Sequence, residues 1–154
     1  MNGRKTYYSF HDIPFKDRDN YDGGIQPSGI KFSRQEIIHI LIAMAALTIA
    51  FSFAFVTYPP LSHIDEVIGF LPLSFLAIAT AFFCHEIAHK YVGQKFGYWS
   101  EFRMYPRGLL FALFLGILAG IVFAAPGAVQ IFGRPDRDEM GKIAVAGPVT
   151  NMIL

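Results

Sequence analysis

The sequence has 154 residues, 53% of them hydrophobic, and a formal net charge of +1. This apolar content is high for a soluble domain of that length and favours a membrane protein. The nearly neutral charge argues against a nucleic-acid-binding protein, and the single cysteine, Cys84, excludes both an intrachain disulfide and a zinc site made of several cysteines.

Residues 1–35 are polar and rich in turn formers, and no apolar run begins before Ile37. We expect them to form an N-terminal extension. Ser33 and Glu36 have the spacing of a capping box, which predicts a helix start here. Residues 37–58 contain no Asp, Glu, Lys or Arg, and as a helix they would span roughly 33 Å, enough to cross a membrane.

A second apolar helix is predicted over residues 70–92, with Pro72 in its first turn, after the acidic loop "LSHIDEVIG" at 61–69. No basic residue lies between Ile37 and Lys90. Because basic residues concentrate on the cytoplasmic side, the sequence predicts a cytoplasmic N-terminus, an external loop at 59–69 and an integral protein of the cell membrane.

Two short strands are predicted from the β-prone stretches "YWSEFRMYPR", 98–107, and "APGAVQIFG", 125–133. The apolar run 109–125 lies between basic flanks and is short for a crossing, which favours a re-entrant segment over a transmembrane helix. A further apolar helix is expected from residue 143. We interpret residues 36–154 as the N-terminal part of a polytopic, all-α membrane domain with short membrane-associated strands.

The motif "HEIAH" at 85–89 contains the candidate metal-binding and catalytic residues. On a helix, His85 and His89 project from one face and can bind one Zn²⁺ ion, while Glu86 can act as a general base toward water activated by the metal. The alternative is a pair of histidines near the membrane interface, with Glu86 paired to Lys90 at i, i+4. Cys84 faces away from both histidines and is expected to pack as a small apolar residue.

The motif is the first of three features that follow one another along the chain: "HEIAHKYVGQKFG", the strand-like pair "EFRMYP" and "APGAVQIFG", and "AGPVTN" at 146–151. With them, the sequence resembles the site-2 protease family of intramembrane zinc metalloproteases, in particular its archaeal and bacterial polytopic members. The resemblance covers residues 70–154.

The resemblance implies a zinc endopeptidase that holds one Zn²⁺ ion in the lipid bilayer and cuts transmembrane segments of protein substrates. His85 and His89 would be ligands and Glu86 the general base. Asn151 would contact the substrate or the developing oxyanion, although an Asn there can also bond a neighbouring helix. The family's third ligand is an Asp on a later helix, so we expect it beyond Leu154 and expect this fragment alone to be inactive.

A second functional hypothesis remains open from the residues themselves. In a non-catalytic metal-binding or metal-transporting membrane protein, the histidines of the apolar segments would line a metal path. That hypothesis would assign roles to His39, His63, His85 and His89.

Overall fold

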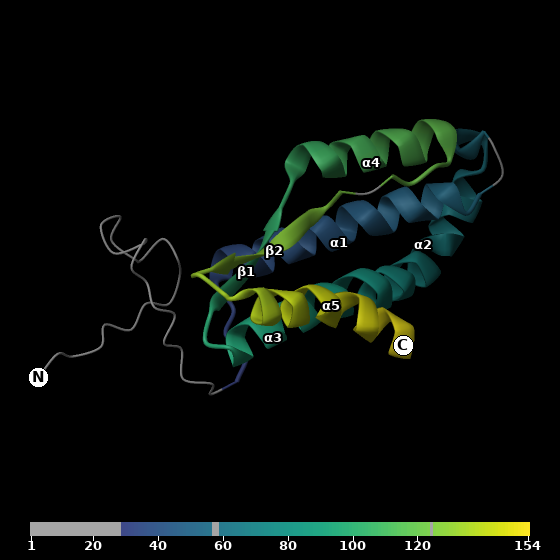
Figure 1. Cartoon of the computed structure of the whole chain (residues 1–154). Helices are drawn as coiled ribbons and strands as arrows, with labels where there is room; N and C mark the ends of the chain where they lie inside the picture. Colours follow the sequence, from purple (N-terminus) through teal and green to yellow (C-terminus); the bar gives the residue numbers. More distant parts are fainter. Residues whose placement is uncertain (1–28, 57–58, 124) are drawn as a thin grey trace, which may run out of the picture.

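The computed structural model describes residues 29–56, 59–123 and 125–154. This part of the chain is mostly helical and contains one small two-stranded sheet (Figure 1). Its main elements are α1 (Arg34–Ala54), α2 (Ile64–Ile78), a π-helical stretch (Ala79–Cys84), α3 (His85–Lys95), β1 (Trp99–Met104), α4 (Pro106–Ala119), β2 (Gly127–Phe132) and α5 (Arg137–Ile153). In Figure 1, α1 lies between α4 and the α2–α3 helix, and α5 lies along α3.

Helix α1 begins earlier than the apolar pattern predicted, at Arg34 in place of Ile37. The capping box explains the start, because the Ser33 hydroxyl accepts the Glu36 amide at 3.1 Å and the Glu36 carboxylate accepts the Ser33 amide at 3.4 Å. The helix ends at Ala54. The expected end at residue 58 lies outside the described residues.

Helix α2 also begins earlier than predicted, at Ile64. The prediction of a loop through residue 69 was therefore wrong. Asp65 and Glu66 fall in its first turn, where carboxylates interact favourably with the positive end of the helix dipole. Pro72 consequently lies in the helix interior and not in the first turn. The helical path continues through the π-helical stretch into α3, from Ile64 to Lys95.

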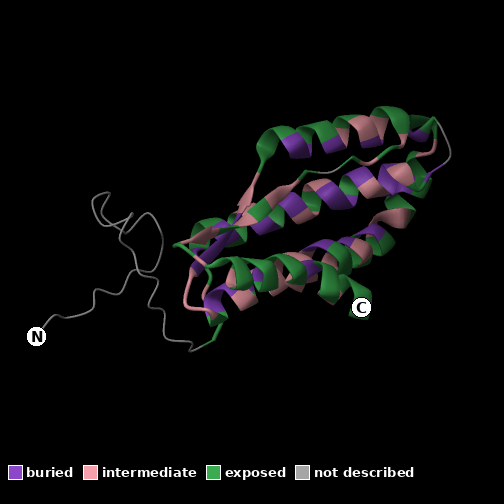
Figure 2. Ribbon diagram, in the orientation of Figure 1, coloured by how far each residue is buried: buried purple, intermediate pink, exposed green. Residues whose placement is uncertain are grey.

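Two helical segments, Arg34–Ala54 and Ile64–Lys95, are long and apolar enough to cross a membrane, judged by length and composition. Much of their surface is open: 39% and 17% of their most apolar windows are buried in the described part of the protein. A core helix of a soluble protein would be mostly covered. Figure 2 shows exposed residues along the outer faces of α4 and α5 as well.

Both predicted strands are confirmed, and they pair with each other. β1 and β2 are antiparallel, with Trp99 opposite Phe132 and Met104 opposite Gly127. Between them, α4 has 14 residues, about 21 Å at 1.5 Å per residue, and ends at Gly120 in the left-handed conformation. After it, residues 121–123 and 125–126 are not helical, and the Tyr105 amide donates to the Pro126 carbonyl at 2.8 Å. The apolar run is therefore a hairpin; its re-entry into a membrane stays a prediction.

Helix α5 begins at Arg137, not at residue 143. A second capping box, formed by Asp136 and Glu139, starts it within the charged stretch. The earlier start gives α5 a full turn of polar residues before its apolar part, which packs along α3. The packed interior is centred on α1, whose buried face Figure 2 shows, and a cluster there includes Ile40, Leu47, Phe82, Phe102 and Leu109.

Candidate metal centre

The two histidines of the motif are brought together by the first turns of α3. His85 is the first residue of this helix, directly after the π-helical stretch, and His89 lies one turn further on. Their rings are nearly perpendicular, at 78°, and their Nε2 atoms are 3.0 Å apart. Two nitrogens bound to one tetrahedral zinc ion, each at 2.0–2.1 Å, would be separated by about 3.3 Å. The pair is therefore close to the spacing that a shared zinc ion needs.

The protonation of His89 follows from its other ring nitrogen. Its Nδ1 lies 2.7 Å from the Ile143 backbone carbonyl on α5. A carbonyl can only accept, so Nδ1 carries the proton and, in the neutral ring, Nε2 has a free lone pair. Histidines that bind metals are commonly oriented in this way, through a hydrogen bond from the second nitrogen.

His85 cannot satisfy both of its nitrogens with the described residues, because its Nδ1 is buried without a hydrogen-bond partner. If Nε2 is protonated it donates to His89, and a lone pair stays buried at Nδ1. If Nδ1 is protonated, the two Nε2 lone pairs face each other at 3.0 Å. A cation between the Nε2 atoms removes that repulsion, so the donor set fits a metal such as Zn²⁺.

Gly147 of α5 leaves the space in front of both histidines open. A Cβ atom at this position would lie 2.4 Å from His89 Nε2 and 2.6 Å from His85 Nε2. These distances are far below van der Waals contact, so any side chain here would displace the imidazoles or occupy the metal position. The one sequence signal for Gly147 is its position in "AGPVTN".

Glu86 follows His85 on α3 and is half-buried next to Val129 of β2, and its Oε2 atom has no hydrogen-bond partner among the described residues. The alternative in which Glu86 pairs with Lys90 is wrong. Lys90 Nζ instead contacts the Glu36 carboxylate at 2.8 Å, because α1 brings a buried acid to the other side of α3. Glu86 thus keeps one carboxylate oxygen without a partner among the described residues.

Asn151 reaches the same region from α5. Its Nδ2 donates to the Ala81 carbonyl of the π-helical stretch at 3.0 Å, and its side chain lies next to His85. The structure thus brings three of the predicted residues, His85, His89 and Asn151, together between α3 and α5, whereas the Glu86 side chain lies next to Val129 of β2. The π-helical stretch was not foreseen.

The described residues contain no group of three or more His, Cys, Asp or Glu side chains arranged to hold a metal ion. His85 and His89 alone therefore do not make a complete metal site. His39 lies on α1, and His63 precedes α2 with its Nδ1 3.3 Å from the Pro59 carbonyl. Cys84 is a free, half-buried thiol.

A protein of Methanocaldococcus jannaschii, provisionally named a zinc metalloprotease, is similar to this chain. The two are 39% identical over 125 residues, which cover 80% of the chain and 60% of that protein. The chain therefore spans less than two thirds of the length of this relative. No family model and no solved structure matches the chain.

Proposed function

We propose that this chain carries part of the active site of a zinc-dependent endopeptidase of the site-2 protease type, which cleaves transmembrane segments of membrane proteins. The observation that carries the proposal is the pair of Nε2 atoms at 3.0 Å in front of a glycine, with His89 oriented by the Ile143 carbonyl. The archaeal relative's name supports zinc and proteolysis. Two histidines leave a typical catalytic zinc site one ligand short, so the third comes from outside the described residues.

In this proposal His85 and His89 hold the metal and Glu86 moves protons. When bound, a zinc ion supplies Lewis acidity that activates water and polarises the scissile carbonyl. The unpartnered Oε2 of Glu86 accepts the proton of the attacking water and returns it to the departing amine. Peptide hydrolysis then balances, with one water consumed and two chain ends produced.

Exposed apolar side chains support a location in the lipid bilayer. Leu41 on α1, Leu76 on α2 and Leu110 on α4 are each more than 60% exposed. Such residues along several helices are unusual for a soluble protein and suited to lipid. With the distribution of basic residues, this favours a cytoplasmic N-terminus and cytoplasmic residues 93–107.

A membrane location also limits the form of the substrate. A helical segment in lipid shields its carbonyls by internal hydrogen bonds, so the substrate must unwind locally before Glu86 can deliver water to it.

Three variants of the full-length protein, reconstituted with a membrane-embedded substrate, test the proposal. Glu86→Gln should lower the cleavage rate by about 10²–10⁴-fold and leave zinc bound, because the amide keeps the carboxylate's shape but cannot accept the proton. His85→Ala and His89→Ala should each lower zinc affinity, since each removes a ligand. Cleavage by Glu86→Gln at the wild-type rate would contradict the mechanism.

The same experiment addresses the metal-transport alternative. In the described part of the protein no metal cluster links His39 or His63 to the His85–His89 pair, so nothing in the structure favours a path through all four. A transporter would bind metal and show no cleavage, and Glu86→Gln would then have no special phenotype.

A further inference from the structure

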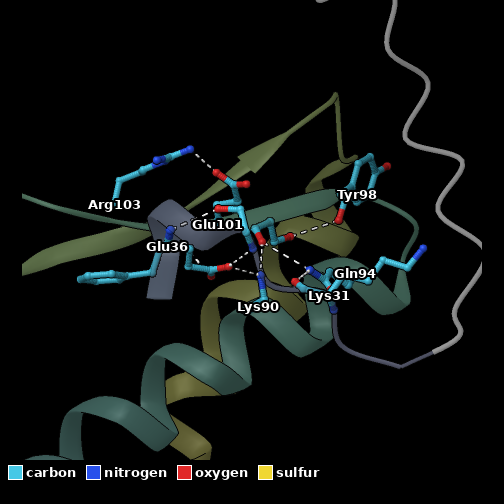
Figure 3. Close-up of polar contacts among 10 residues, drawn as sticks. Lys31, Glu36, Lys90, Gln94, Tyr98, Glu101 and Arg103 are labelled. Atoms are coloured by element: carbon cyan, nitrogen blue, oxygen red, sulfur yellow. Dashed lines mark hydrogen bonds and ion pairs between the residues drawn. The ribbon is translucent and has the colours of Figure 1, made fainter. Parts of the chain in front are cut away.

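The side of α3 that faces α1 and β1 carries a buried ion pair (Figure 3). Lys90, directly after His89, is 1% exposed. Its Nζ donates to Glu36 Oε2 at 2.8 Å and to the Ser100 carbonyl at 2.6 Å. The ring of Phe32 also lies 4.7 Å from Nζ, within the range of a cation–π contact. The charge of Lys90 is thus fully surrounded by partners.

Glu36 connects this lysine to two other elements. Besides Lys90, its carboxylate accepts the Phe102 amide of β1 at 2.9 Å through Oε1 and the Ser33 amide at 3.4 Å through Oε2. The side chain is 0% exposed. One carboxylate therefore holds together the start of α1, strand β1 and the metal-binding helix α3.

Gln94, one turn after Lys90, extends the connection to the segment before α1. Its side-chain amide accepts the Lys31 amide and donates to the Lys31 carbonyl, both at 2.9 Å. It also donates to the Ser100 carbonyl at 3.4 Å. The segment at 31–33 is therefore attached to α3 through two successive turns of that helix.

We propose that Glu36 and Lys90 are positioning residues for the metal centre: they fix the rotation of α3, so that His85 and His89 face Gly147. The inference rests on the proposed function. Lys90 is about 100° around the helix from His89, so a rotation that turned His89 away from α5 would also pull Lys90 from Glu36 and Ser100. The polar contacts on one side of α3 thereby hold the ligands on the other.

The competing explanation is that the pair only stabilises the fold. Stability and positioning separate experimentally, because replacing both members of a buried ion pair by uncharged residues often leaves stability unchanged, whereas removing one leaves an uncompensated charge. The double variant Glu36→Gln/Lys90→Met is therefore the informative one, and Lys95→Met, at an exposed lysine of the same helix, is the matched control.

The test uses the full-length protein and measures three properties: melting temperature, zinc affinity by competition with a chelator, and the visible spectrum of the Co²⁺-substituted protein, which reports ligand geometry. The double variant should melt near the wild type, yet bind zinc about tenfold more weakly, with an altered Co²⁺ spectrum. Its kcat should fall while its KM stays the same. Lys95→Met should match the wild type in all of these properties.

Wild-type zinc affinity, Co²⁺ spectrum and kcat in a double variant of wild-type stability would overturn the positioning role. If that variant fails to fold, Lys90→Arg serves in its place. Arg keeps the charge and donors but has a different shape, so a normal melting temperature with a shifted Co²⁺ spectrum supports positioning, and an unchanged spectrum and zinc affinity overturn it.

The outcome is separable from that of the proposed function. Zinc affinity and the Co²⁺ spectrum need no substrate, so a wild type that binds zinc without cleaving would refute the protease and still test the pair. Cleavage that depends on Glu86 but not on the pair would refute the positioning role alone.

Discussion

The polar atoms on the two sides of helix α3 differ in whether they have hydrogen-bond partners. On the side toward α5, His85 Nδ1 has no partner among the described residues, and two histidine nitrogens face each other at 3.0 Å. Glu86 Oε2, next to β2, also lacks a partner there. On the side toward α1 and β1, Lys90 and Gln94 are bonded to several groups. Both sets of residues come from one short helix of 11 residues.

Buried polar groups usually find partners, because an unpaired one costs about 1–3 kcal/mol. On the side toward α1 and β1, called the satisfied side below, the polar atoms of Lys90 and Gln94 have their partners within the protein. On the side toward α5, called the unsatisfied side, the histidine nitrogens lack partners that a bound ion would supply. Within α3 this difference distinguishes the two sides, although each contains ionisable residues; elsewhere, buried atoms such as Trp99 Nε1 and Glu101 Oε1 also have no partner among the described residues. The predictions below alter one side at a time.

The largest effect is expected on the satisfied side, from Glu36→Gln. The amide leaves the Lys90 charge buried without its counterion, and breaking a buried pair in this way typically costs about 3–5 kcal/mol. We expect a loss of that order in the free energy of unfolding, measured by denaturation in detergent. The control Glu66→Gln, at an exposed acid of α2, should change it by less than about 0.5 kcal/mol. A loss below 1 kcal/mol for Glu36→Gln would show that the pair contributes little.

Gly147→Ala should have the next largest effect, on the unsatisfied side. The added methyl would meet both Nε2 atoms at 2.4–2.6 Å, so we expect zinc affinity to fall by about 100-fold, equivalent to about 2.7 kcal/mol, and cleavage to fall with it. Isothermal titration with zinc measures the change.

Gly141→Ala is the control for this substitution, because it lies on the same helix and its Cβ would meet nothing within 4 Å. It removes the flexibility of a helical glycine and should leave zinc binding unchanged or stabilise the protein slightly. Equal zinc affinity in the two variants would mean that the metal does not bind in front of Gly147.

The local contacts on the two sides of α3 were predictable from the sequence, and the long-range contacts were not. The i, i+4 spacing of His85 and His89 places them together on any α-helix, and the structure keeps that spacing. The same rule paired Glu86 with Lys90, and there it failed. Glu36 is 54 residues from Lys90 in the chain, and its capping-box pattern predicts only its local bonds, which α1 does form.

The start of α2 and the role of Gly147 were missed for different reasons. Polar residues at a helix start made "HIDEVIG" resemble a loop, although Asp65 and Glu66 suit a first turn. Gly147 lies in front of the histidines because α5 packs on α3, and the sequence alone does not show that packing. Periodicity identifies the helices, but not which residue of one helix faces which residue of another.

The smallest effect is expected from Asn151→Ala, which asks whether this side chain belongs to the scaffold or to the chemistry. Its Nδ2 already donates to the Ala81 carbonyl at 3.0 Å, which ties α5 to the π-helical stretch before His85. We expect a loss of about 0.5–1.5 kcal/mol in the free energy of unfolding, the usual value of one hydrogen bond, and only a small change in kcat.

Thr150→Val is the neighbouring control, because its hydroxyl bonds the Ala146 carbonyl within the same helix and bridges no elements. An oxyanion-stabilising Asn would behave differently: kcat would fall by about 10²–10³-fold at unchanged stability. Steady-state kinetics and denaturation on the same preparations distinguish the two, and the second pattern would move Asn151 from the scaffold to the reacting groups.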